Sequence, residues 1–155
     1  MEKLWAPWRS KYIYSRKRKG CIFCGNRTDK KADRYVIDRT KHSFSMLNLY
    51  PYNNGHAMVA PHRHVKSLEL LSDAEIADLM RLVNKTKIKI DRSLKPDGYN
   101  IGMNLGKTGG AGYTGHLHIH IVPRWEGDAN FMPVLSDTGV ISESLKAMSG
   151  LLKKR

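Results

Sequence analysis

This chain has no long apolar run and few acidic side chains. No segment of its 155 residues is apolar for the ~20 positions that a membrane-spanning helix needs, and its charged start lacks the apolar stretch typical of a signal peptide. Asp and Glu number 14 against 27 Lys and Arg, which gives a net charge of +13. We therefore expect a cytoplasmic protein without a membrane segment, a single domain over residues 1–155 and an anionic partner.

The positive charge is concentrated at the ends of the chain. Residues 1–19 form a basic, aromatic-rich extension, and residues 153–155 are all Lys or Arg. Nucleic acid, nucleotides, phosphosugars and acidic membrane surfaces all match this charge, as does solubility alone. No helix-turn-helix or RNA-binding motif accompanies it, so nucleic acid is not the partner we expect. The aromatic side chains predict that the extension packs against another surface.

Cysteine occurs only twice, as Cys21 and Cys24. In a cytoplasmic protein this CxxC spacing is typical of a metal site or of a thioredoxin-like redox site. A redox motif opens a helix directly after a buried strand, whereas this pair follows a basic segment and precedes the turn-like Gly25-Asn26-Arg27. We therefore predict a zinc knuckle over residues 20–28, with thiolates as ligands. A reduced pair without metal is the alternative.

Apolar patterning predicts a sheet with two main helices. Short β-branched and aromatic runs indicate strands near 35–37, 43–47, 57–60, 100–105 and 116–122, with Pro61 and Pro123 ending two of them. Ser72 and Glu75 form a capping box for a long helix that ends at Pro96, and a second helix begins near Ser142. This order predicts an α+β fold on an antiparallel sheet of about five strands.

The most informative segment places histidine at every second position, as His116, His118 and His120. Alternate side chains of a strand share one face, so these imidazoles should line up while Leu117 and Ile119 face a core. Imidazole binds metals, and near neutral pH it also acts as a nucleophile. The spacing alone leaves open a metal-binding strand and a strand with a nucleophilic histidine.

A glycine-rich loop over residues 106–115 leads into this histidine row. Backbone amides of such loops bind phosphate oxygens. The loop has neither the P-loop pattern nor the dinucleotide-binding pattern, so a flexible hairpin loop is the alternative. Its position directly before the histidines of a basic chain favours phosphate binding.

Together these motifs resemble the histidine-triad (HIT) superfamily of nucleotide hydrolases and transferases. Residues 116–122 match its alternating histidine–apolar signature, and the CxxC, Gly55-His56, residues 60–64 and the 104–112 loop follow in the family's order. Residues 4–9 and 123–133 are similar to the bacterial branch that includes diadenosine tetraphosphate phosphorylases. The resemblance implies the HIT α+β fold, a homodimer and a nucleotide substrate. It also implies cleavage of dinucleoside polyphosphates through a covalent nucleotidyl-histidine, with phosphate or water as acceptor.

The same resemblance implies roles for single residues. His118 corresponds to the nucleophile, His120 to the histidine that contacts phosphate and assists the leaving group, and His56 to an upstream histidine beside them. Asn48 corresponds to a ribose contact and Asn104 to a polar group near the scissile bridge.

The phosphate cradle corresponds to the backbone around Gly110, Ala111 and Gly112. Many relatives place Gln, Ser or Thr where this chain has Gly112 and Tyr113, so either backbone amides or Thr114 makes that phosphate contact. Zinc-bearing relatives imply the structural metal ligands Cys21, Cys24, His64 and His116.

Three other functions stay open at this point. A nucleoside phosphoramidase would use the same site, a nucleotide-sensing protein would bind there with little catalysis, and a zinc-stabilised module would bind nucleic acid through the basic ends. Outside the site we expect His42 at the solvated surface, His62 at the surface or rim, and Trp125 in the core or a dimer interface.

Overall fold

The computed structural model describes residues 20–25, 35–128 and 143–153. The predicted extension over residues 1–19, the part of the knuckle beyond Gly25 and the 129–133 segment lie outside this description. The elements are α2 (Ile22–Gly25), β1 (Val36–Arg39), β2 (Ser43–Leu47), β3 (Ala57–Pro61), the 3-10 helix η1 (Leu68–Leu70), α4 (Asp73–Leu94), β4 (Gly98–Gly102), β5 (Ile119–Arg124) and α6 (Leu145–Lys153).

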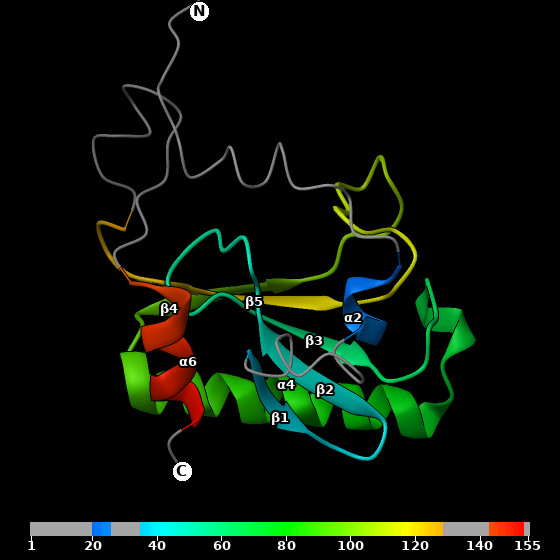
Figure 1. The fold of residues 1–155 in the computed structure, drawn as a ribbon, viewed down its shortest axis with the longest axis horizontal. Coiled ribbons are helices and arrows are strands. Elements are labelled where there is room, and N and C mark those ends of the chain that lie inside the picture. The colour runs from blue at the N-terminus through cyan, green and yellow to red at the C-terminus, as the bar shows by residue number, and fades with distance from the viewer. Residues whose placement is uncertain (1–19, 26–34, 129–142, 154–155) are drawn as a thin grey trace, which may run out of the picture.

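The strands form one five-stranded antiparallel sheet in the order β1-β2-β3-β5-β4, which confirms the predicted α+β architecture (Figure 1). The strand that carries His120, β5, lies between β3 and β4, and Met58 of β3 pairs with His120. Hydrogen bonding on both sides holds this strand firmly, so side chains projecting from it are well positioned. None of the described helices is both long enough and apolar enough to cross a membrane.

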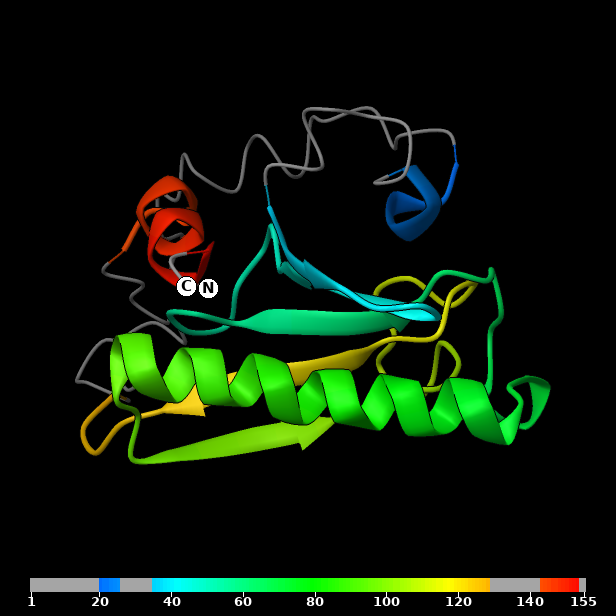
Figure 2. The same cartoon turned by 90° about the horizontal axis from the view of Figure 1, so that it is seen from below.

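The two faces of the sheet have different cover. The long helix α4 lies along one face, where Val59 and Ile121 of the sheet join Leu82 and Ile90 of the helix in the larger core (Figure 2). The one-turn helix α2 lies over the opposite face (Figure 2). Its Phe23 belongs to a second apolar cluster with Phe44, Met46 and Met58, among others. We call this second face the histidine face.

The capping box is present as predicted. The Ser72 side chain accepts a hydrogen bond from the Glu75 amide, and the Glu75 carboxylate accepts from the Ser72 amide at 2.9 Å. These bonds satisfy backbone donors that a helix start leaves unpaired. At the other end α4 closes at Lys95, whose left-handed φ of 48° turns the chain towards β4.

The bounds of several strands differ from the sequence prediction, and β1 covers Val36–Arg39 and not 35–37. The fourth strand covers Gly98–Gly102 and not 100–105, because its pairing with β5 begins directly after the helix. Pro123 does not end β5, which runs to Arg124. The β3 partners end at Ile121, and Pro123 pairs with Tyr99 of β4 while its carbonyl accepts from Asn53 at 3.1 Å, so its missing N–H leaves no ladder bond unmade.

The strand also begins later than the histidine row. His116 and His118 precede β5, yet Leu117 and Ile119 already lie in the α4 core while both histidines contact Phe23 on the histidine face. The predicted alternation of faces is therefore confirmed before the ladder starts. The last helix begins at Leu145, where the Ser144 hydroxyl accepts from the Ala147 amide; Ser142 lies outside the described residues.

Candidate catalytic site and metal site

The histidines of the row and His56 form one continuous cluster of rings. The centroids of His118 and His120 are 4.9 Å apart, and those of His120 and His56 are 5.1 Å apart. His56 and His118 are buried, and His120 is half-buried. The structure thus brings together the three residues that the sequence suggested for catalysis.

The proton on His118 is placed by a backbone carbonyl. His118 Nδ1 lies 2.9 Å from the His116 carbonyl oxygen, which can only accept, so Nδ1 carries the hydrogen. In a neutral ring the other nitrogen, Nε2, then holds a lone pair. This is the arrangement that a nucleophilic or metal-binding imidazole needs.

The position of the proton on His56 is set by a hydrogen-bond donor, whereas that on His118 is set by an acceptor. The Tyr52 amide donates to His56 Nδ1 at 3.0 Å, so the hydrogen of His56 sits on Nε2. His56 Nε2 lies 2.9 Å from His120 Nδ1 and donates to it. His120 Nδ1 is therefore an acceptor, and the remaining nitrogen of neutral His120 carries an N–H that can donate to a ligand.

Burial keeps these rings neutral at physiological pH. Loss of water lowers the pKa of His56 to about 3, and the neighbouring His120 and His118 lower it further in the same direction. Burial, followed by the proximity of His118, lowers the pKa of His120 to about 4. Burial also lowers the pKa of His118, although its bond to the His116 carbonyl acts the other way. The cluster therefore offers neutral imidazoles, as nucleophilic attack requires.

A tight turn brings His56 to the cluster. Gly55 has a φ of 72°, and a Cβ there would lie 2.5 Å from Leu94 Cδ1, so the position requires glycine. The Asn48 amide lies 3.4 Å from His56 Nδ1, and its oxygen accepts from the Tyr50 amide at 2.9 Å. Asn48 is thus beside the histidine cluster, where its predicted ribose contact stays a prediction.

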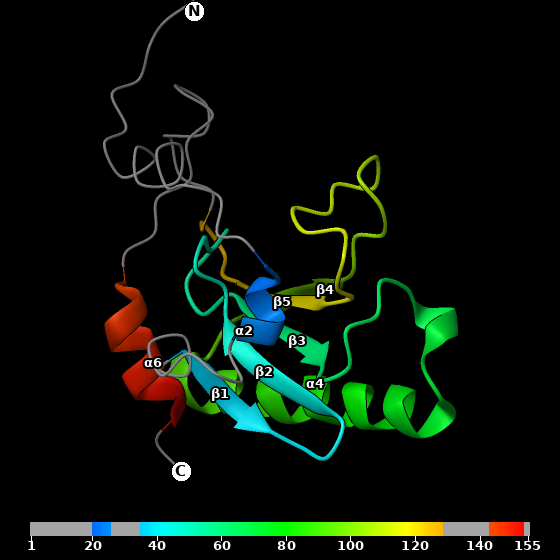
Figure 3. The same ribbon diagram turned by 45° about the vertical axis from the view of Figure 1, so that its right-hand side comes forward.

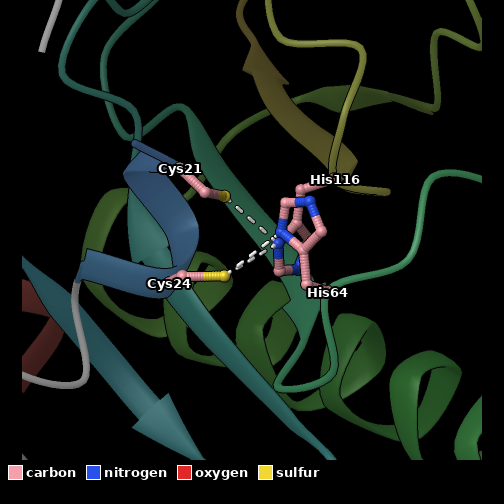
Figure 4. A group of neighbouring side chains, drawn as sticks. All are labelled: Cys21, Cys24, His64 and His116. Carbon is pink, nitrogen blue, oxygen red and sulfur yellow. Dashed lines mark hydrogen bonds between the residues drawn. The ribbon is translucent and has the colours of Figure 1, made fainter. Parts of the chain in front are cut away.

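The metal ligands that the resemblance implied converge from three parts of the chain (Figure 4). Cys21 and Cys24 come from the α2 turn, His64 from the segment after β3, and His116 from the segment before β5. Their ligand atoms all lie within 4.8 Å of one another. His116 Nε2 donates to the Pro61 carbonyl at 2.9 Å, so its Nδ1 presents a lone pair to the sulfurs.

The spacing of these atoms fits a tetrahedral zinc ion. His116 Nδ1 is 3.3 Å from Cys21 Sγ and 3.6 Å from Cys24 Sγ, and His64 Nδ1 is 3.3 Å from Cys24 Sγ. Bond lengths of about 2.3 Å for Zn–S and about 2.0 Å for Zn–N place tetrahedral ligand atoms about 3.5 Å apart. Two sulfurs and two imidazoles form a donor set typical of structural zinc.

Tyr113 closes the metal site from the side of the glycine-rich loop. A hydrogen bond with the Cys21 side chain, followed by burial, raises the pKa of Tyr113 to about 12. Its ring meets the edge of Phe23, with 6.1 Å between the centroids. A Cβ on Gly115 would lie 3.3 Å from the Tyr113 ring, so glycine at that position lets the ring lie close.

The predicted phosphate cradle lies in the loop between β4 and β5, which projects beyond the sheet (Figure 3). Gly110, Gly112 and Thr114 are exposed and Ala111 is half-buried. Asn104 Nδ2 donates to the Gly110 carbonyl at 3.2 Å, so this residue shapes the loop. Contact of the loop with phosphate stays a prediction.

The residues that we expected outside the site are all half-buried, which is less exposed than predicted for His42 and more exposed than a core position for Trp125. His62 is half-buried: its ring stacks on Phe44 with centroids 5.5 Å apart, and Nε2 donates to the Thr40 carbonyl at 3.1 Å. His42 is also half-buried, and its amide donates to Asp78 at 3.2 Å. Trp125 is half-buried, and its amide donates to Asp128 at 3.1 Å.

Sequence reasoning missed two aromatic residues that contact the cluster. Phe23 lies with its centroid 4.7 Å from that of His118, and Tyr52 lies 4.7 Å from His56 and 5.9 Å from His120. Phe23 stands inside the CxxC, which marks it as a residue that a metal would hold in place. Tyr52 precedes a turn, and the residues of a turn predict only that the chain changes direction.

Comparison with known proteins agrees with the family that the sequence motifs resemble. The family model described as the HIT domain matches residues 29–127. A protein named AP-4-A phosphorylase, from Mycobacterium tuberculosis, is 45% identical over 117 residues, which cover 76% of this chain and 60% of that protein. A bis(5'-nucleosyl)-tetraphosphatase (asymmetrical) from Schizosaccharomyces pombe is 37% identical over 93 residues, which cover 60% of this chain and 50% of that protein.

The chain thus spans less than two thirds of the length of these curated relatives. Among solved structures, a Zn-bound histidine triad family protein from Mycobacterium smegmatis has a TM-score of 0.70 and 24% identity, and the match covers 86% of this chain and 91% of that one. That likeness is one of fold.

Proposed function

Because this chain belongs to the HIT domain family, we propose that it cleaves dinucleoside polyphosphates such as diadenosine tetraphosphate through a covalent nucleotide on His118. The observation that carries the proposal is the hydrogen bond from His118 Nδ1 to the His116 carbonyl, which leaves Nε2 as the nucleophilic atom. The similarity to an AP-4-A phosphorylase supports the substrate class.

In the first half-reaction His118 Nε2 attacks the α-phosphorus. A P–N bond forms, the bridging P–O bond breaks, and the departing nucleoside polyphosphate takes the electron pair. Splitting the displacement into two steps in this way is what a nucleophilic side chain contributes. The positive charge that develops on the ring is stabilised at Nδ1–H by the His116 carbonyl.

The leaving group and the phosphate oxygens need hydrogen-bond donors. His120 has its N–H on Nε2 because His56 donates to its Nδ1, so we assign His120 to the leaving oxygen. His56 fixes that tautomer, and the Tyr52 amide fixes the tautomer of His56. We assign the amides of Gly110, Ala111 and Gly112, with Thr114 and Asn104, to the phosphate chain, and Asn48 to the ribose.

In the second half-reaction the acceptor oxygen attacks phosphorus and the P–N bond breaks, which returns the electron pair to His118. With phosphate as acceptor, diadenosine tetraphosphate gives ATP and then ADP; with water it gives ATP and AMP. The excess of 27 basic over 14 acidic residues favours anionic substrates in both cases.

We also propose a structural zinc at Cys21, Cys24, His64 and His116, which their donor set and spacing support. When bound, the ion would tie α2 to the segments before β5 and after β3. A homodimer is proposed on the edge strand β4, whose Ile101 is 45% exposed. A single domain in the cytoplasm stays a prediction.

Product analysis tests the reaction class. Incubation with diadenosine tetraphosphate should give ADP and ATP only in the presence of phosphate if the protein is a phosphorylase. AMP and ATP without phosphate would show a hydrolase, whereas two ADP would show hydrolysis at the central bridge and contradict attack at the α-phosphorus. Cleavage of adenosine phosphoramidate alone would favour the phosphoramidase instead.

Trapping in an alkaline denaturant tests the covalent step, because the P–N bond of a nucleotidyl-histidine survives base and breaks in acid. Substrate labelled at the α-phosphate should leave one acid-labile nucleotide on the wild-type protein and none on His118→Ala, which should still bind nucleotide. His62→Ala is the matched control, because this histidine stacks on Phe44 outside the row and should leave labelling intact. Turnover by His118→Ala would contradict the mechanism.

A further inference from the structure

Phe23 covers the ring of the proposed nucleophile. Its side chain is 1% exposed, and its ring centroid lies 4.7 Å from that of His118, with 33° between the ring planes. It also lies 5.1 Å from His116. No other phenylalanine in the described residues has a ring contact with the histidine row.

The hydrogen bond of His118 does not by itself fix the direction of Nε2. A single bond from Nδ1 to the His116 carbonyl sets the tautomer but still allows the ring to tilt about that contact. The flat face of Phe23 restricts that tilt. Because displacements of about 1 Å at a reacting atom cost roughly 100-fold in rate, such a restriction matters for attack on phosphorus.

Phe23 has little secondary structure to hold it. It belongs to α2, which covers only the four residues Ile22–Gly25. Isolated helices shorter than about 12 residues are marginal in water, so α2 must be held by its contacts. Those contacts are the apolar side chains of the histidine face and, on both sides of Phe23, the metal-ligating sulfurs of Cys21 and Cys24.

We propose that Phe23 is a positioning residue for His118: metal binding at the CxxC fixes the α2 turn, which presses the Phe23 ring against the nucleophile and keeps His118 Nε2 directed at the substrate. Metal occupancy thereby controls the rate of the chemical step. This inference rests on the proposed role of His118, and it concerns the way in which that role depends on the metal site.

The neighbouring residue supplies a matched control. Ile22 stands in the same turn between the same cysteines, but its side chain is 42% exposed. Phe23→Ala should slow formation of the nucleotidyl-enzyme in a single turnover by roughly 10- to 100-fold, with nucleotide binding unchanged. Phe23→Leu, which preserves apolar volume without the flat ring, should lie between, and Ile22→Ala should match the wild type.

A second readout follows the ring itself and needs no substrate. In ¹⁵N-histidine NMR spectra, wild-type His118 should show one sharp Nδ1–H form. Phe23→Ala should broaden or split that signal, whereas Ile22→Ala should not. Should Phe23→Ala fail to fold, Phe23→Leu carries the same test. Wild-type spectra in both variants of Phe23 would overturn the proposal.

Removing the metal separates the Phe23 route from a direct one. If the metal acts through Phe23, chelation should slow nucleotidyl transfer in the wild type to the rate of Phe23→Ala, and should change Phe23→Ala little further. If chelation slows both proteins by the same factor, the metal acts through His116 and its carbonyl, and the proposal is wrong. Absence of a nucleotidyl-enzyme in wild type would refute the proposed function instead, while the NMR test of Phe23 would still stand.

Discussion

The two ends of the histidine row differ in what holds each imidazole. At the metal end, His116 donates to the Pro61 carbonyl and turns a lone pair towards two sulfurs from the α2 turn. At the phosphate end, His120 accepts from His56, which itself accepts from a backbone amide. Both imidazoles thus carry their hydrogen on Nε2, but His116 uses that N–H on a carbonyl and turns its Nδ1 lone pair to the sulfurs, whereas the Nδ1 of His120 is occupied by His56 and its N–H is left for a ligand.

The proposed nucleophile, His118, lies between these two ends and depends on both. His118 takes its proton position from the carbonyl of His116 and lies 4.9 Å from the ring of His120. A disturbance at the phosphate end should therefore change the chemistry directly. A disturbance at the metal end should first change stability and only then, through Phe23, the chemistry.

Among variants that test this difference between the two ends of the row, His120→Ala should have the largest effect. Losing a donor that acts only as the leaving group departs should lower kcat by roughly 10²- to 10⁴-fold, with KM changed little. Metal content and the midpoint of thermal unfolding should stay near wild type. Steady-state kinetics with metal analysis check this, and a loss of bound metal would contradict the separation of the two ends.

The next largest effect should come from His64→Ala, which removes one proposed metal ligand and keeps every histidine of the row, although the edge contact of the His64 ring with His116, 5.1 Å between centroids, is lost. Mutation of a residue that only orients a metal ligand typically lowers metal affinity by roughly 10- to 100-fold. Removal of the ligand itself should lower the affinity by more than that. Stability at fixed metal concentration should fall as well, because an ion at 100 times its dissociation constant contributes about 2.7 kcal/mol. Metal titration and thermal unfolding measure both.

His64→Cys is the control for that change. Zinc accepts three thiolates and one imidazole as readily as two of each, so this variant should bind metal again and recover thermal stability. Equal losses in His64→Cys and His64→Ala would show that His64 is needed for packing and not as a ligand.

A smaller effect should appear in the pH dependence of stability. The pKa values of His56 and His120, about 3 and 4, lie below the ordinary 6.5, so the unfolded chain binds protons first as the pH falls. The contribution of each neutral histidine to the free energy of unfolding is fully present above pH 6.5. It is lost as the pH falls towards the pKa of that histidine in the folded protein. The slope is about 1.4 kcal/mol per pH unit for each histidine.

Urea unfolding between pH 7.5 and pH 4.5 checks this sign. The difference between wild type and His56→Gln isolates one histidine, since both proteins retain the metal ligands. A wild-type stability that rises on acidification, relative to His56→Gln, would mean that His56 is charged in the folded protein.

The smallest effect should come from Tyr52→Ala. The Tyr52 ring is 66% exposed and packs on His56 with 4.7 Å between centroids. Because burial is the main cause that lowers the pKa of His56, removing this cover should raise that pKa towards its ordinary value. NMR titration of His56 measures the change, with Tyr50→Ala as the neighbouring control. An unchanged titration would show that the sheet alone keeps water away.

Much of the scaffold could be predicted because its signals are local. Ser72 and Glu75 satisfy each other within one helical turn, so their pairing can be read from the spacing. The alternation of His116, Leu117 and His118 between two faces likewise needs only an extended backbone. Pro123 was misjudged because its tolerance depends on which neighbouring strand lies beside it, and pairing between distant strands leaves no local signal.

The site could be predicted only in part. The cysteine spacing and the histidine row pointed to the two thiols and three of the histidines that meet in space, and the resemblance to a family added His56 and His64 to them. The contact of Phe23 with His118 joins residues 95 positions apart, and the sequence marks it only as an apolar residue between two cysteines.

The sequence by itself determined which side chains are available and on which face of the sheet they stand, because both follow from local spacing. Only the tertiary structure decided what each histidine can do. The carbonyl that sets the His116 tautomer belongs to Pro61, 55 residues away, and the ring that sets the His120 tautomer belongs to His56, 64 residues away. The proton of an imidazole goes to the nitrogen that faces an acceptor and stays off the nitrogen that faces a donor, and folding alone brings those partners into place.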